Sequence, residues 1–226
     1  MEPMSFIRRR LLFWVILFTI GAIHPRAKAI TYVSNLGNLW TEGGIGDVHG
    51  LFPGGNPYGT DTARFTTGSG PGFSLDAITI EFYPGTTSQP WNYVDVQLFQ
   101  QTGSGSLLLG SLGNPVVNPT PTQWPGSTTF IDFLPLTSIS LSALTQYSVV
   151  FSVPTSSPIA AALLFTRSSA YTTPANWVMG PTTTGNPYTS GERLVMAVNA
   201  TAVPEPSVLG LLTLAGLFFG LRRSHG

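Results

Sequence analysis

Short runs in which apolar and polar residues alternate make up most of the chain between residues 30 and 202. In the run at 77–84, two isoleucines and a phenylalanine alternate with threonine, glutamate and tyrosine. A period of two predicts β-strands with one buried face and one solvent-facing face. The same pattern occurs at 30–36, 93–100, 128–135, 147–154, 162–168 and 193–200. Segments rich in Gly, Pro, Ser and Thr separate these runs, and no segment has a convincing helical period. The sequence therefore predicts an all-β domain, an antiparallel β-sandwich or jelly roll.

Charge is distributed unevenly along the chain, although the formal net charge of the whole is zero. Between residues 30 and 202 the basic residues are Arg64, Arg167 and Arg193, against eight acidic residues, which gives a net charge of −5. An acidic body argues against a nucleic-acid partner, because phosphate binding needs clustered Lys and Arg. The chain has no cysteine, which excludes disulfides, thiolate catalysis and cysteine-ligated metal sites. We expect no cofactor.

Residues 1–29 have the three parts of a secretory signal peptide. A basic segment at 8–10 precedes an apolar run of 13 residues at 11–23, and Ala27 and Ala29 provide a small-x-small cleavage site. The apolar run is too short to cross the roughly 30 Å hydrocarbon core of a bilayer comfortably. We predict a signal peptide that is cut after Ala29; an uncleaved N-terminal anchor is the alternative.

Residues 203–226 end the chain with a Pro-Glu-Pro motif, a largely apolar run and paired arginines. The residues concerned are Pro204, Glu205 and Pro206 in the motif, and Arg222 and Arg223 in the tail. The apolar run at 207–221 would be about 22 Å long as a helix, which makes it a marginal membrane span. Arginines stay on the cytoplasmic side of a membrane, so both ends of the chain predict an acidic body outside and basic tips inside.

This layout closely resembles the PEP-CTERM protein-sorting signal. The resemblance implies that a membrane-embedded exosortase recognises the motif and the paired arginines as parts of a substrate, and that it cuts near the motif. It also implies a Gram-negative bacterium that makes extracellular polysaccharide. An ordinary tail anchor is the alternative. The chain would then have three units: a signal peptide at 1–29, an exported domain at 30–202 and a sorting signal with a transmembrane helix at 203–226.

The body resembles the bacterial choice-of-anchor domains, the R type in particular, over roughly residues 60 to 180. The blocks that carry the resemblance are ARFTTG (63–68), FSLDAITIEF (73–82), VDVQLFQQTGSGSLL (94–108) and LSALTQYSVVFSVP (141–154). The third block takes the place of a strand followed by a Gly-rich hairpin. The resemblance implies a surface-exported β-sandwich and brings no established catalytic residues.

Aromatic residues in turn-rich segments are the candidates for ligand binding. Trp91, Trp124, Tyr58 and Tyr188 are the residues we single out, and Trp40, Trp177 and Tyr171 have similar surroundings in the sequence. Exposed aromatic rings can stack on the apolar faces of sugar rings. The alternative, which we favour, is that these rings fill the ends of the sandwich.

Few residues could carry catalysis or bind a metal. Glu81 and Asp95 could be near neighbours on successive strands, as glycoside hydrolysis requires, but alternation places both on solvated faces. His49, with Asp47 and Asp61 nearby in the sequence, is a weak metal candidate. We therefore expect neither catalytic nor metal-binding residues.

Together these features predict a non-enzymatic exported protein of the cell envelope or extracellular matrix. It would insert transiently in the inner membrane and then reach the cell surface or the biofilm matrix. Its partners would be the exosortase, the export machinery, the membrane and extracellular polysaccharide, but not nucleic acid. The alternative function is a carbohydrate-binding module of the matrix.

Overall fold

The computed structural model describes residues 29–36, 48–51, 60–82, 90–118, 129–156, 161–166, 171, 173, 176–181, 183–184 and 193–203. The strands are β1 (Ile30–Ser34), β2 (Val48–Leu51), β3 (Thr60–Thr66), β4 (Phe73–Phe82), β5 (Asp95–Thr102), β6 (Gly105–Asn118), β7 (Thr129–Pro135), β8 (Ser140–Leu141), β9 (Gln146–Ser152), β10 (Ala161–Thr166), β11 (Val178–Met179), β12 (Thr183–Thr184), β13 (Arg193–Leu194) and β14 (Met196–Ala202). A short 3₁₀ helix, η1 (Pro90–Tyr93), precedes β5.

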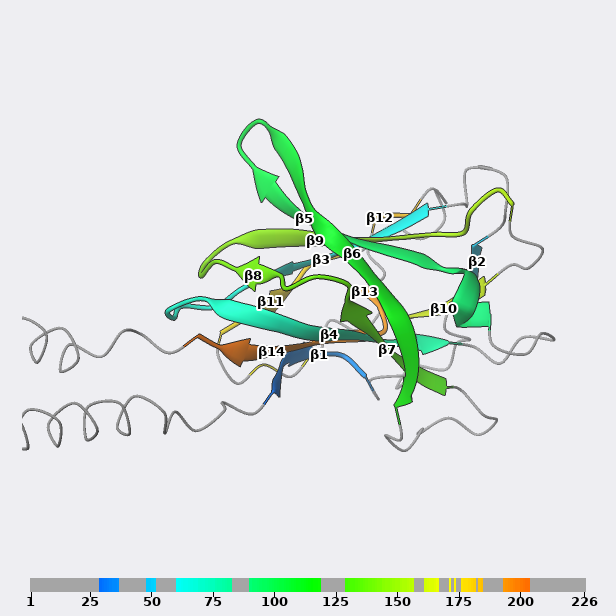
Figure 1. The fold of residues 1–226 in the computed structure, drawn as a ribbon, viewed down its shortest axis with the longest axis horizontal. Helices are drawn as coiled ribbons and strands as arrows, with labels where there is room; N and C mark the ends of the chain where they lie inside the picture. The colour runs from blue at the N-terminus through cyan, green and yellow to red at the C-terminus, as the bar shows by residue number, and fades with distance from the viewer. Residues whose placement is uncertain are drawn as a thin grey trace, which may run out of the picture.

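The strands form one antiparallel sheet that is nearly closed into a barrel (Figure 1). Their order is β1-β14-β4-β7-β6-β5-β9-β3-β11, while β8 pairs with β4, β12 pairs with β3, and β10 links β4 to β2 and β13. The first and last strands of this order meet, because the ring of Tyr32 in β1 stacks on Trp177 next to β11 with centroids 4.8 Å apart. The all-β antiparallel class predicted from the alternation is thus confirmed.

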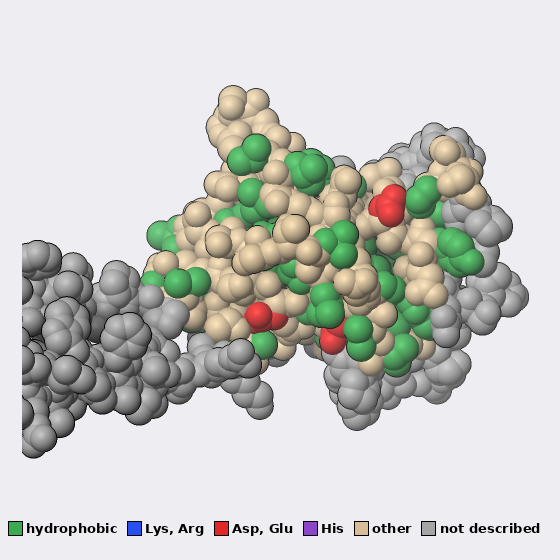
Figure 2. Space-filling view, in the orientation of Figure 1, with side chains coloured by type: hydrophobic (Ala, Val, Ile, Leu, Met, Phe, Trp, Pro, Cys, Tyr) green, Lys and Arg blue, Asp and Glu red, His purple; other side chains and the backbone are tan. Residues whose placement is uncertain are grey.

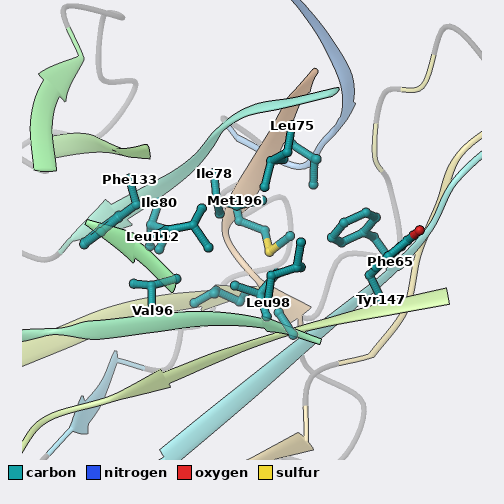
Figure 3. Close-up of a cluster of buried hydrophobic side chains, with 14 of the residues drawn as sticks. Phe65, Leu75, Ile78, Ile80, Val96, Leu98, Leu112, Phe133, Tyr147 and Met196 are labelled. Carbon is teal, nitrogen blue, oxygen red and sulfur yellow. The ribbon is translucent and has the colours of Figure 1, made fainter. Parts of the chain in front are cut away.

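Apolar side chains from all sides of the sheet fill the interior (Figure 3). The labelled members are Phe65, Leu75, Ile78, Ile80, Val96, Leu98, Leu112, Phe133, Tyr147 and Met196. They sit at alternate positions of strands that are neighbours in the sheet, so each run of period two places its apolar residues on the inner face. Burying one such side chain contributes about 1.5–3 kcal/mol, which lets a domain without disulfides hold together.

A strand lies at each of the seven places that the alternation predicts, but the alternation did not predict two long strands, β3 and β6. β6 contains glycines and a proline, which weaken a strand pattern. Its register shifts between Gly113 and Val116, where Asn114 has a φ of 46°. This bulge bends β6, which curves across the barrel from the β5–β6 hairpin to β7 (Figure 1).

The barrel has two different ends. At the terminus end, β1 begins and β14 ends side by side, and short turns join β3 to β4, β5 to β6 and β8 to β9. At the opposite loop end, β3 and β7 begin while β4 and β9 end. The segments that connect strands at the loop end include 52–59, 83–89 and 119–128, which lie outside the described residues.

Candidate functional site

An aromatic cluster closes the terminus end of the barrel. Trp177 is fully buried, and its ring stacks on Tyr32 at 4.8 Å and Phe65 at 5.7 Å, while Phe73 meets it edge-on at 5.0 Å. Stacked and edge-to-face rings at such distances add about 0.5–1.5 kcal/mol per pair beyond their burial. Trp177 is therefore a core residue, as the favoured alternative has it, and no ligand can stack on it.

Trp91 is the one described residue among the aromatics singled out for ligand binding. It lies in η1, is half-buried, and meets Phe82 edge-on with ring centroids 6.0 Å apart. Part of its ring therefore packs on the core at the loop end, and part stays accessible. Tyr171 is also half-buried against the core. Trp40, Trp124, Tyr58 and Tyr188 lie outside the described residues.

The structure corrects both expectations about Glu81 and Asp95. Two strands, β7 and β6, lie between β4 and β5 in the sheet, so the two carboxylates are not neighbours. Glu81 is also not solvated: its side chain is 0% exposed, whereas Asp95 is exposed. The alternation predicted that Glu81 lies on the outer face of β4. The tertiary structure covers that face here, because Phe130 opposite Glu81 is buried, and so is Val195, whose carbonyl accepts from the Glu81 N–H at 3.2 Å. The pair does not form the two-carboxylate arrangement of a glycosidase.

Asp61 is a buried acid, and its burial was not predicted from the sequence. It shares the inner face of β3 with Ala63 and Phe65, lies opposite Phe151 of β9, and is only 2% exposed. Its Oδ2 atom finds no hydrogen-bond partner within the described part of the chain. Burial raises the pKa of this carboxyl from 3.8 to about 7, because water no longer stabilises the charge. The sequence TDTARF could have indicated this burial, because Asp61 has the same parity as Ala63 and Phe65. That segment was not predicted to be a strand.

His49 and Asp61, the two metal candidates that the structure describes, lie on strands that are not paired with each other. His49 lies in β2, which pairs with β10, whereas Asp61 lies in β3 between β9 and β12. Asp47 lies outside the described residues. Among the residues that are described, no three His, Asp or Glu side chains are grouped so that they could hold a metal ion.

A chain of hydrogen bonds crosses the outer face of four strands at the β1 side of the sheet. Thr31 donates to the Asn199 Oδ1 atom at 2.7 Å, Asn199 Nδ2 donates to Thr79 Oγ1 at 2.7 Å, and Thr79 Oγ1 donates to Asp132 at 2.5 Å. The polar faces of β1, β14, β4 and β7 are thus tied to each other. Asn199 uses both polar atoms of its side chain in this chain of hydrogen bonds, so these groups form a structural ladder between the strands.

The two ends of the body leave the barrel at one place. Ile30 pairs with Ala200 in neighbouring strands, and Val203 donates its backbone N–H to the carbonyl of Gly72 at 3.1 Å. Ala29 of the expected cleavage site is exposed just before β1. Ala27, Pro204, Glu205, Pro206, Arg222 and Arg223 lie outside the described residues. Within the described ranges, no helix is long and apolar enough to cross a membrane.

Acidic side chains are scattered on the visible face of the molecule among uncharged polar and apolar ones (Figure 2). The buried Asp61 and the half-buried Trp91 give the loop end its distinct chemistry, and the aromatic cluster gives the terminus end its packing. No protein-family model matches the sequence, and no curated protein matches it either. The two family resemblances therefore rest on the residues quoted for them alone.

Proposed function

We propose that this chain is a non-enzymatic exported protein of the cell envelope or extracellular matrix, sorted through its C-terminal Pro-Glu-Pro motif by an exosortase. The observation that carries the proposal is where the folded body ends. The N–H of Val203 makes a backbone hydrogen bond to Gly72, and the next residue is Pro204. The last described strand, β14, thus ends directly before the motif, and a sorting signal that follows a folded domain requires this order along the chain.

The position of both chain ends at the terminus end supports the same proposal. β1 and β14 are paired, so the expected signal cleavage site and the sorting motif leave the barrel next to each other. In this proposal the barrel-like sheet is a flattened sandwich of the jelly-roll kind, with a signal helix before it and a membrane helix after it. The terminus end then faces the inner membrane, and the loop end faces away from it.

The test replaces the motif in the full-length protein, with Pro204→Ala, Glu205→Ala and Pro206→Ala together, in a bacterium that has an exosortase. Intact mass and cell fractionation report where the chain is cut and where it goes. We expect the native protein to lose its C-terminal segment and reach the surface, and the variant to stay full-length in the membrane. Leu144→Ala, at an exposed turn, is the matched control. Equal processing of native and variant chains would refute the proposal.

Binding of matrix polysaccharide is the second candidate function of the same exported body. It is favoured by Trp91, which stays partly accessible at the loop end. Trp91→Ala should then reduce retention of the protein on the polysaccharide of its own matrix, with Tyr93→Ala as the control in the same 3₁₀ helix. Equal retention of the Trp91→Ala variant and the native protein would argue against this role.

A further inference from the structure

Large apolar side chains are exposed at the terminus end of the barrel, and we name this set the apolar rim. Its members are Ile30, Leu107, Leu108, Leu136, Leu144 and Val203, and each is between 43% and 74% exposed. A single exposed apolar residue is ordinary on a protein surface, whereas a group of them at one place is typical of an interaction surface. The apolar rim is therefore a candidate for contact with another apolar surface.

Segments far apart in the chain bring the apolar rim together at this end. Ile30 begins β1 and Val203 follows β14, and these two strands are paired. Leu136 directly follows β7, and Leu144 lies in the turn between β8 and β9. The adjacent leucines 107 and 108 lie in the β5–β6 hairpin, which continues past the last residue of β5 that pairs with β9, Gln100. Figure 1 shows the end of β14 and the β8–β9 turn at the left, and the tip of the hairpin above them.

The turns at this end carry no charge. Residues 67–72, 101–110 and 136–145 contain only Gly, Pro, Ser, Thr, Gln, Ala, Leu and Ile. Glu81 and Asp95, in contrast, lie where β4 ends and β5 begins, at the loop end. In Figure 2 the projecting hairpin shows hydrophobic and uncharged polar side chains and no acidic or basic ones. The terminus end can therefore approach an apolar phase without removing water from charged groups in these turns.

The length of chain after Val203 indicates what lies against the apolar rim. The apolar run at 207–221 begins four residues after Val203, and four residues span at most about 14 Å when fully extended. With that run in a membrane, the terminus end is held within this distance of the hydrocarbon core. The headgroup region extends about 5–8 Å beyond the core on each side. The nearest surface of the barrel is thus at or close to the lipid headgroups.

We propose that the terminus end of the barrel docks on the surface of a lipid bilayer, with the apolar rim among the headgroups, while the C-terminal tail is inserted. This inference rests on the proposed function for one step, the insertion of the tail before it is cut. The tether keeps the rim at a high effective concentration near the lipid, so a weak contact is sufficient. Apolar side chains make this contact, so it does not require anionic lipids. Cutting near the motif removes the tether and lets the barrel leave the membrane.

Fluorescent labels at single positions test the docking in the full-length protein, reconstituted in phosphatidylcholine vesicles. The chain has no cysteine, so one introduced cysteine carries the only label. We expect the dye NBD on Leu108→Cys or Leu144→Cys to emit at a shorter wavelength and to be quenched by lipids that carry a doxyl group near the headgroup. Val117→Cys is the matched control, because Val117 is 57% exposed but lies near the end of β6, opposite Ile131 of β7 and toward the loop end. Its label should emit as in water.

Two double variants separate apolar docking from nearness that the tether alone causes. Leu107→Ser with Leu108→Ser should weaken the quenching of the label on Leu144→Cys, because less apolar surface then contacts the lipid. Val116→Ser with Val117→Ser changes another adjacent pair of exposed apolar residues on the same strand, and it should leave the quenching unchanged. Circular dichroism melts show whether each variant is folded. The quenching of the native rim should persist at high salt, because the rim has no charge to screen.

Flotation of the vesicles distinguishes failure of docking from failure of tail insertion. A chain that floats with the vesicles while its labels on Leu108→Cys and Leu144→Cys behave like the control would overturn docking and leave the proposed function standing. Unchanged quenching after both hairpin leucines are replaced by serine would overturn docking as well, and so would loss of the quenching at high salt. A full-length chain that does not float would contradict both the docking and the insertion of the tail.

Discussion

The two ends of the barrel are built in different ways. At the terminus end, Trp177 and its neighbouring rings fill the interior, and backbone hydrogen bonds such as that from Val203 to Gly72 fasten the chain. At the loop end, the buried carboxyl of Asp61 lies on the inner face and Trp91 covers the core only in part. The two ends therefore differ in what they bury. The terminus end buries a group of stacked rings, in which Trp177 Nε1 finds no hydrogen-bond partner within the described residues, whereas the loop end buries a carboxyl group.

Replacing a tryptophan at each end gives the largest test of this comparison. Trp177→Ala should lower the free energy of unfolding by about 3–5 kcal/mol, because it leaves a large cavity among rings that cannot collapse. Trp91→Ala should cost about half as much, because its ring is half-buried. Urea unfolding measures both. A loss for Trp91→Ala as large as that for Trp177→Ala would break the comparison.

The pH dependence of stability tests the cost at the loop end. In the unfolded chain Asp61 ionises near its ordinary pKa of 3.8, whereas burial raises its pKa to about 7 in the folded protein. Its contribution to stability therefore becomes less favourable as the pH rises from about 4 to about 7, and levels off above that.

Asp61→Asn removes this cost. We expect the variant to gain roughly 4 kcal/mol over the native protein at pH 8 and little at pH 4, as measured by urea unfolding at both values. Asp95→Asn, at an exposed site on β5, is the control and should change stability little at either pH. The same gain at pH 4 and pH 8 would contradict the role assigned to burial.

Both ends of the barrel contain buried hydrogen bonds, which allow the contribution of hydrogen bonding to be compared between them. At the loop end of β1, Asn35 donates to the Leu194 carbonyl at 2.9 Å and accepts from the Met196 N–H at 2.8 Å. At the terminus end, Thr67 donates to the Ser142 carbonyl at 2.7 Å and accepts from the Thr145 N–H at 2.9 Å.

Asn35→Ala and Thr67→Val should each cost about 2 kcal/mol, because each leaves buried backbone groups unsatisfied. Thermal unfolding measures both losses of stability. Similar losses for the two variants would mean that the ends differ in side-chain packing and buried charge, and not in hydrogen bonding. A loss confined to one end would mean that hydrogen bonding also differs.

Leu144 provides the smallest expected effect. It is 74% exposed in the turn before β9 and has a φ of 50°, a left-handed conformation that is unfavourable for leucine. Asparagine adopts this conformation more easily, so Leu144→Asn should raise the free energy of unfolding by about 0.5 kcal/mol. A destabilised variant would show that the exposed side chain has contacts that its burial does not reveal.

Prediction from the sequence succeeded where the local pattern and the burial agree. The runs at 77–84 and 147–154 became β4 and β9, with their apolar residues on the inner face. It failed at β6, because the glycines and the bulge at Asn114 interrupt the alternation. The prediction that Glu81 is exposed to solvent was also wrong. The alternation indicates on which face of the sheet a side chain lies, but not whether other residues cover that face.

The candidate site was less predictable than the fold. Trp91 and Trp177 both follow turn-forming residues in the sequence, yet one is half-buried and the other is fully buried. The proximity expected for Glu81 and Asp95 assumed that successive strands are neighbours, whereas β7 and β6 lie between them. Strand order depends on long-range pairing, which a single sequence does not reveal.

The sequence by itself determined the antiparallel β class, the acid balance of the body and the chemical character of its two ends, because these depend on residue type and on spacing of a few positions. Only the tertiary structure decided which strands are neighbours, that Asp61 and Glu81 are buried, and that β1 and β14 bring both chain ends to one place. The physical reason is that side-chain burial and strand pairing depend on contacts between residues far apart in the chain. A local sequence pattern does not indicate which residues those are.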